Sequence, residues 1–278
     1  MLFLTADEVR VAEAADRTTA CSSTLSHTCL DAGELAGYSG RTYDRPLHSK
    51  TAFSMAPVSR TVPRRAVSRI RPVAPGDVQL AFAQAAAADG IVLGSQSFDW
   101  LCEQGHVGLE RVAKVRRDPA LVGPVTAALE TLGAIYARLK GDISVLHASR
   151  ENLLLPVDLM HEPTGTVIEV DESLHFTSFR LTTLELYPPD VTVGFDLDEH
   201  KQLCRAWCSR TDALASGLAA KGFGFGGVQR ERAYHDALRD LATPAMGHPP
   251  LVRIAAVDGD GVAAYHRHRA SLLTLRAS

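Results

Sequence analysis

The chain has 278 residues, 46% of them hydrophobic, and a formal net charge of -3. This length and composition suit a soluble globular protein with one substantial domain and a smaller one. The charge excludes a global basic field that would draw in nucleic acid, so contact with DNA would have to come from local basic patches. The five cysteines show neither a disulfide framework nor a paired metal-binding spacing, and no apolar run is long enough to cross a membrane. We therefore expect a cytoplasmic protein with no membrane partner.

The N-terminal quarter differs in composition from the rest of the chain. It is rich in Ser, Thr and Gly and lacks an apolar period, which predicts a disordered arm over residues 1–74, with Met55 as an alternative start. Residues 60–71 within it form a basic run without acids, which is typical of a solvated arm and would also suit one that contacts phosphates. Residues 75–123 are predicted to be helical, beginning with a helix that Asp77 caps.

Residues 98–117 favour two helical stretches separated by Gly105, a spacing similar to that of a helix-turn-helix. In such a unit the second helix reads DNA, and here it would end at Arg116 and Arg117. An ordinary helical hairpin is the alternative interpretation. The two interpretations differ in whether this region binds nucleic acid.

The remainder, residues 124–278, alternates between helical and strand patterns, which predicts an α/β domain. Strands are expected at 143–148, 152–161, 166–172 and 250–257. Helices are expected at 124–140, 176–187, 197–220, 230–242 and 262–276. The glycine-rich segment 221–229 predicts a mobile loop through which Lys221 could reach a nucleic-acid substrate.

Acidic residues are concentrated on the strand 166–172, where burial would be costly without a compensating partner. Side chains alternate along a strand, so Glu169 and Asp171 lie on one face. Asp158 lies on the preceding strand, and the tight turn between the two strands should bring it beside Glu169. Three close carboxylates suit Mg²⁺ or Mn²⁺. His175, just beyond the strand end, could exchange a proton there.

Two other arrangements of these side chains are open. Arg180 or Arg253 could neutralise Glu169 and Asp171 by ion pairing, with no metal. A different metal site could come from the helix 197–220, which carries His200, Cys204 and Cys208 at helical spacing. That stripe also carries Leu197, Trp207 and Leu214, and both Cys and His pack well in cores, so we expect a core face there.

The order Asp158, Glu169-x-Asp171 and His175 resembles the PD-(D/E)XK nuclease superfamily. The closest likeness is to the branch that contains very-short-patch repair endonucleases and related restriction-endonuclease-like proteins of unknown function. In that branch a later helix and strand carry a D-x-x-R-D-like core, a Gly and a V-x-R or L-R ending, similar here to Asp236, Arg239, Asp240, Gly247 and LVRI at 251–254. The resemblance covers about residues 124–278. It departs from the pattern at Glu172 (usually Gly), at Asp171 (usually Lys in the superfamily) and in an insertion at about 192–229.

The resemblance implies a restriction-endonuclease-like core with a mixed central sheet flanked by helices. It also implies Mg²⁺-assisted cleavage of phosphodiester bonds in DNA, in repair or phage defence. It implies that Asp158 and Glu169 hold the metal, that Asp171 positions metal or water, and that His175 acts as general base or acid. Glu130 would be an additional acid beside the metal, and Arg253 would stabilise charge on the phosphate or contact DNA. The alternatives are a catalytically inert nucleic-acid-binding protein that keeps the fold, and a DNA-binding protein that reads sequence with residues 97–117.

Overall fold

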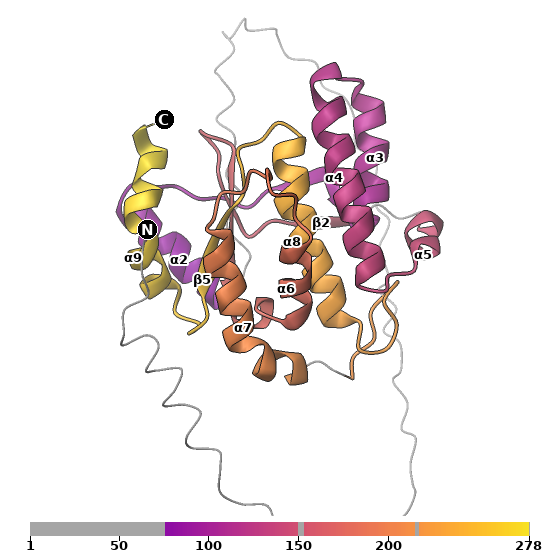
Figure 1. Cartoon of the computed structure of the whole chain (residues 1–278). Coiled ribbons are helices and arrows are strands. Elements are labelled where there is room, and N and C mark those ends of the chain that lie inside the picture. Colours follow the sequence, from indigo (N-terminus) through magenta and orange to yellow (C-terminus); the bar gives the residue numbers. More distant parts are fainter. Residues whose placement is uncertain (1–75, 150–152, 215–216, 278) are drawn as a thin grey trace, which may run out of the picture. The chain divides into compact units, whose positions relative to one another are not determined.

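The structure is a computed structural model that describes residues 76–149, 153–214 and 217–277. The predicted arm, residues 1–74, lies outside the described residues, together with its basic run. The described chain is a mixed α/β structure with two small sheets and helices around them (Figure 1).

A three-stranded sheet of order β3-β4-β5 positions the acidic strand. Its strands are β3 (Leu159–His161), β4 (Thr166–Glu172) and β5 (Val252–Ala256), with β3 antiparallel and β5 parallel to β4. A turn over residues 162–165 joins β3 to β4, and Gly165 adopts a φ of 70° there, which favours glycine. The register pairs Leu159 with Ile168. The predicted hairpin is therefore confirmed, and Asp158 comes next to Glu169.

Helices cover both faces of this sheet (Figure 1). One face packs on α2 (Asp77–Ala88) and α9 (Gly261–Leu272), in a core where Ile168 and Val170 meet Phe82 and Tyr265. The other face carries Val167, Glu169 and Asp171 toward α6 (Ser178–Glu185), α7 (Leu197–Leu214) and α8 (Val228–Ala245). The predicted alternation along β4 is confirmed, because its apolar side chains divide between two cores.

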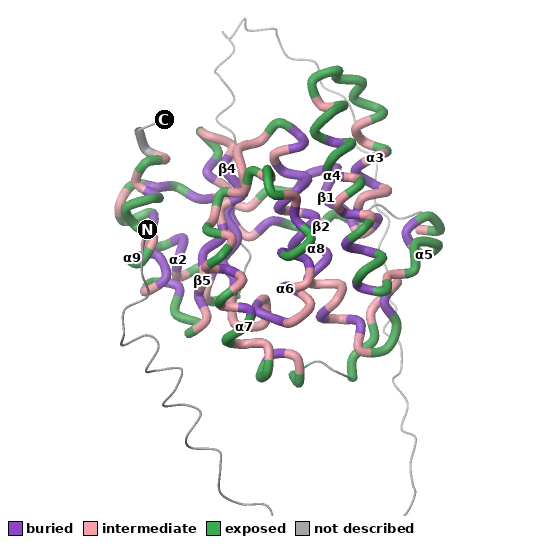
Figure 2. Tube along the Cα trace, in the orientation of Figure 1, coloured by how far each residue is buried: buried purple, intermediate pink, exposed green. Residues whose placement is uncertain are grey.

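Helix α8 brings acidic groups against β4. It is one of the most buried helices in the described chain, as the purple tube in Figure 2 shows. Its buried residues include Asp236 and Asp240 as well as apolar side chains such as Tyr234, Leu238 and Leu241. An acidic strand and a helix with buried acids therefore face each other across the same core.

The helix-turn-helix prediction is wrong. Residues 97–102 form a strand, β1 (Ser97–Cys102), which pairs antiparallel with β2 (Leu154–Pro156), and only α3 (Gly105–Arg116) is helical. Trp100 and Leu101 are fully buried, so this stretch is held by core packing and strand pairing rather than by a second helix. Residues 76–123, the described part of the predicted helical region, are consequently not all helical.

Other boundaries also differ from the predictions. Residues 143–148 form a helix, α5 (Ile143–Ala148), because Asp142 accepts a hydrogen bond from the Ser144 backbone N–H and caps it. The predicted strand 152–161 is two strands, since β2 and β3 join different sheets on either side of Val157 and Asp158. Leu214 was predicted to face the core but is 68% exposed, because it lies in the last turn of α7.

Helix α4 (Pro119–Arg138) begins before the predicted 124–140 helix, where Asp118 caps it by accepting from the Ala120 N–H. By length and composition alone it is apolar enough to cross a membrane, contrary to the expectation that no apolar run reaches that length. Its buried face, which includes Leu132 and Ile135, packs in the larger core beside α3 and α8. The chain ends in a short 3-10 helix, η2 (Leu273–Ala277).

Candidate functional site

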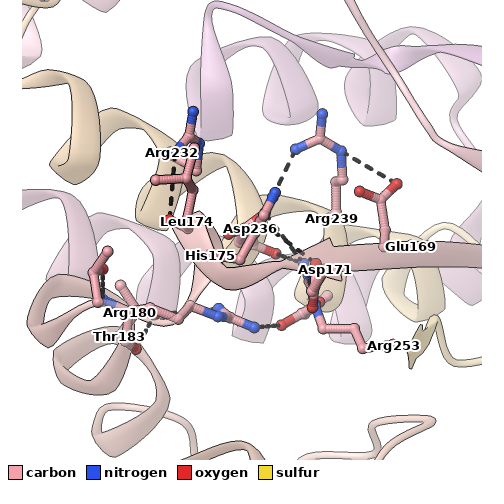
Figure 3. Close-up of polar contacts among 12 residues, drawn as sticks. Glu169, Asp171, Leu174, His175, Arg180, Thr183, Arg232, Asp236, Arg239 and Arg253 are labelled. Atoms are coloured by element: carbon pink, nitrogen blue, oxygen red, sulfur yellow. Dashed lines mark hydrogen bonds and ion pairs between the residues drawn. The ribbon is translucent and has the colours of Figure 1, made fainter. Parts of the chain in front are cut away.

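A buried polar cluster lies where β4 ends, between β4, the 3-10 turn η1 (Ser173–His175) and α8 (Figure 3). Asp171 is at its centre and is fully buried. Arg253 on β5 donates from Nη1 to both Asp171 oxygens, at 2.7 and 3.0 Å. The interpretation that an arginine neutralises this strand is confirmed for Asp171 and Arg253.

Arg253 also binds the two acids of α8. Its Nε donates to Asp240 Oδ1 at 2.7 Å, and its Nη2 donates to the Asp236 carbonyl at 3.0 Å. Asp240 in turn accepts from Arg180 at 2.5 Å and from the Tyr187 hydroxyl at 2.7 Å. Arg180 therefore pairs with α8 and not, as one alternative supposed, with the carboxylates of β4. Burial raises the pKa of Asp240, but Arg253 and Arg180 outweigh burial and leave that pKa below its ordinary value.

His175 lies beside the carboxylates of Asp236 and Asp171. Its Nδ1 lies 3.0 Å from Asp236 Oδ2 and 3.4 Å from Asp171 Oδ1. Burial lowers the His175 pKa, but the charges of Asp236 and Asp171 outweigh burial and raise it. The pKa of Asp236 lies well below its ordinary value, because His175 and Arg253 outweigh the opposite effect of burial. Ligand atoms of Asp171, His175 and Asp236 lie within 4.8 Å of one another, so this group could hold a metal ion.

Glu169 lies on the same strand face, two residues before Asp171, and is 3% exposed. Burial raises its pKa to about 8, although the positive charge of Arg239 opposes this. Arg239 Nε is 3.6 Å from Glu169 Oε1, and the same oxygen accepts from the Asp158 backbone N–H at 3.1 Å. Glu169 is therefore protonated near neutral pH and holds a proton beside the Asp–His–Asp group.

Asp158 is adjacent to Glu169, as predicted, but its carboxylate accepts a hydrogen bond from the backbone of the β3–β4 hairpin. Its Oδ2 accepts from the Val170 backbone N–H at 2.9 Å. Burial raises the pKa of this half-buried carboxyl, and the Val170 hydrogen bond acts in the opposite sense. Among the described residues, Asp158 and Glu169 do not belong to the group whose ligand atoms could share an ion. Of the predicted metal residues, Asp171 alone belongs to that group.

The sequence interpretation missed two residues of the cluster. Asp236 entered only as part of the D-x-x-R-D pattern and was given no role. His200 on α7 was placed in a core face, and it is indeed 5% exposed and packs on Phe176 and Phe195. However, its Nε2 lies 3.6 Å from Asp171 Oδ2, and burial lowers its pKa to about 3, so the imidazole is neutral.

The remaining predicted residues lie elsewhere. Glu130 is exposed on α4, and Lys221 is exposed in the turn that follows Ala220. Arg116 is exposed at the end of α3 and pairs with Asp99 at 2.7 Å. Arg117 follows it, exposed and in the left-handed region with a φ of 53°. In the part of the chain that the structure describes, these four exposed side chains are not part of the buried cluster.

Comparison with known proteins gives one partial match. The model of a family of unknown function, DUF7255, matches residues 134–222. The matched segment contains β4, η1 and α7, and hence Asp171, His175 and His200, but neither α8 nor β5. No curated protein and no solved structure matches the chain. The site must therefore be interpreted from its own chemistry.

Proposed function

We propose that this protein is a metal-dependent endonuclease that hydrolyses phosphodiester bonds in DNA, with a restriction-endonuclease-like core. The observation that carries the proposal is the Asp171–His175–Asp236 group at the end of a hairpin strand. The hairpin of β3 and β4 and the helical connection to a parallel β5 support it, because the resemblance of the sequence implies that order of elements.

In this proposal Mg²⁺ or Mn²⁺ is held by Asp171, Asp236 and the Nδ1 atom of His175. When bound, such an ion polarises a phosphate oxygen and lowers the pKa of a water molecule. The protein then has to supply proton transfer. Glu169 suits this task, because burial keeps it protonated near neutral pH and a carboxylic acid in that state can donate to a leaving oxygen.

The geometry thus favours His175 as the metal ligand and Glu169 as the proton-transfer group, the reverse of the roles predicted from the sequence. The sequence made Glu169 a metal ligand and His175 the proton-transfer group. In the structure His175 Nδ1 faces two carboxylates, which is the environment of a ligand, whereas Glu169 is held by Arg239 and a backbone N–H outside that group. Arg253 is fully buried and bound to three aspartates, so we assign it to positioning Asp171 and not to the phosphate.

A second candidate function is favoured by one observation. Arg253 already neutralises Asp171, and a buried carboxylate paired in this way does not require a metal ion. On this reading the protein is an inert nucleic-acid-binding protein that keeps the nuclease fold. The two candidates differ in whether a divalent ion is needed for any activity on DNA.

The test is a nicking assay on supercoiled plasmid with Mg²⁺, with Mn²⁺ or with EDTA. Nicking is expected with an ion and not with EDTA, and Asp171→Asn should abolish it while circular dichroism shows a folded protein. Glu162→Gln, an exposed carboxylate in the turn of the same hairpin, is the matched control and should nick at the wild-type rate. A folded wild-type protein that nicks DNA with neither ion would favour the second candidate.

A further inference from the structure

We propose that the Asp171–His175–Asp236 group selects a transition-metal ion, such as Mn²⁺, Co²⁺ or Zn²⁺, over Mg²⁺. The proposal refines the metal site of the proposed nuclease and rests on that assignment for its catalytic meaning. Its test measures binding, so its outcome is separable from that of the nicking assay.

The first support is the chemistry and spacing of the ligands. One of the three ligand atoms is an imidazole nitrogen, which suits Zn²⁺ and its neighbours, whereas Mg²⁺ is bound through oxygen and water. His175 Nδ1 lies 3.0 Å from Asp236 Oδ2 and 3.4 Å from Asp171 Oδ1. Metal bonds of about 2.0–2.1 Å in a tetrahedral site place neighbouring ligand atoms about 3.3–3.4 Å apart. The separation from Asp171 is close to that value, the separation from Asp236 is that of a hydrogen bond, and all three ligand atoms lie within 4.8 Å of one another.

Burial is the second support. Asp171 is fully buried and Asp236 is 1% exposed. Mg²⁺ demands near-octahedral coordination and usually keeps several waters, for which this environment leaves little room. Zn²⁺ is satisfied by four ligands. The side chain of His175 is 25% exposed, so the group is open to solvent mainly on the histidine side.

Four buried side-chain atoms of the cluster have no hydrogen-bond partner, namely Arg180 Nε, Arg239 Nε, His200 Nε2 and Asp236 Oδ1, and the last two bear on a metal site. His200 Nε2 and Asp236 Oδ1 are buried and have no hydrogen-bond partner, although buried polar atoms nearly always have one. His200 Nε2 is directed at Asp171, 3.6 Å from Oδ2. Metal-binding carboxylates are commonly held by such a partner, which makes His200 a positioning residue for Asp171. Asp236 Oδ1 makes no hydrogen bond, and its nearest charged neighbours are Arg253 Nη2 at 3.5 Å and Arg239 Nη1 at 4.0 Å.

The charge balance of the cluster is the fourth support. Its carboxylates outnumber its guanidinium groups by five to three. The carboxylates are Asp158, Glu169, Asp171, Asp236 and Asp240, and the guanidinium groups are Arg180, Arg239 and Arg253. Burial keeps Glu169 protonated near neutral pH, so four ionised carboxylates face three guanidinium groups, and one negative charge is left uncompensated in a buried region, which is costly. A bound cation would compensate it.

Calorimetric titration of the chelator-treated full chain tests the proposal, with Mn²⁺, Zn²⁺ and Mg²⁺ in separate runs. Stoichiometric binding of Mn²⁺ and Zn²⁺ is expected, with Mg²⁺ weaker by about 100-fold or more. Co²⁺ is a spectroscopic probe, and its visible bands should show a low-coordinate site with nitrogen ligation. Equal or tighter Mg²⁺ binding, or a Co²⁺ spectrum typical of six oxygen ligands, would overturn the proposal.

Variants locate the ion. His175→Gln and Asp236→Asn should abolish Zn²⁺ binding, and His200→Phe should weaken it by about 10–100-fold. His147→Ala removes an exposed histidine on α5 and should bind as wild type. If His175→Gln does not fold, Zn²⁺ binding by Asp236→Asn and the Co²⁺ spectrum of the wild type still show whether the ion binds at this group. Zn²⁺ binding without nicking would reject the nuclease alone, whereas Mg²⁺-dependent nicking that needs Asp158, in a chain that does not bind Zn²⁺, would reject this inference alone.

Discussion

Arg253 and Asp171 are joined by a bidentate contact, with Nη1 at 2.7 and 3.0 Å from the two carboxylate oxygens, and neither side chain is exposed to solvent. The strand β4 can therefore carry Asp171 into the core because β5, its parallel neighbour, supplies the opposite charge. The same guanidinium reaches Asp240 and the Asp236 backbone on α8. One arginine thus ties the strand and the helix that form the candidate metal site.

Removing that arginine should be strongly destabilising. Arg253→Met would leave Asp171 and Asp240 without their shared partner, and breaking a buried pair typically costs about 3–5 kcal/mol. Urea denaturation should show a loss of this size in the free energy of unfolding. Arg116→Met, which breaks the exposed pair with Asp99, is the control and should cost at most about 1 kcal/mol. Equal, small losses in both variants would show that the buried network is not needed for stability.

Glu169 should make the metal-free protein less stable as pH rises. Burial raises the pKa of Glu169 to about 8 in the folded state, above its ordinary value of 4.5. The folded state therefore binds more protons than the unfolded state between these values, and the free energy of unfolding falls as pH increases through that window. Glu169→Gln cannot lose the proton, so its stability should fall less between pH 6 and pH 9. Chemical denaturation at several pH values measures this, and parallel curves for the two proteins would contradict the assignment.

His200 should act in the opposite sense on the acid side. Its pKa is about 3 in the folded state, below the ordinary 6.5, because it is buried. The unfolded state then binds the extra proton, so stability is lost as pH falls from about 6.5 toward 3. In His200→Phe the free energy of unfolding should fall less over this pH range. If it falls as steeply as in the wild type, His200 titrates normally in the folded protein. NMR titration of the imidazole should show no protonation near pH 6.

Metal binding should stabilise the folded protein by linkage. An ion that binds only the native state at 100 times its Kd adds about 2.7 kcal/mol to the free energy of unfolding. We expect Mn²⁺ to raise the Tm of the wild type and to leave that of Asp236→Asn unchanged. An equal rise in both would place the ion outside the Asp–His–Asp group.

The sequence predicted the local part of the site well. Alternation along β4 and the short turn before it are properties of neighbouring residues, and they correctly put Glu169 and Asp171 on one face with Asp158 beside Glu169. The contribution of α8 depends on a contact between segments far apart in the chain, so Asp236 could not be assigned a role from spacing. His200 was missed for a related reason. An amphipathic pattern predicts that a side chain is buried, but it does not predict which polar atom that side chain will contact.

The errors in the fold have physical causes of the same kind. The segment around Trp100 forms a strand because β2 offers it a pairing partner and the core buries its aromatic side chain, which overrides its helical pattern. Residues 143–148 carry β-branched and apolar side chains, yet the cap from Asp142 starts a helix there. The secondary structure of such short segments depends on the residues that pack against them or cap them.

The most direct test of the account is the position of the ion itself. The protein should be crystallised with Mn²⁺ and an anomalous difference map calculated at the manganese absorption edge. The account predicts a peak bonded to His175 Nδ1 and to carboxylate oxygens of Asp171 and Asp236. A peak between Asp158 and Glu169, or no peak within the described cluster, would contradict it.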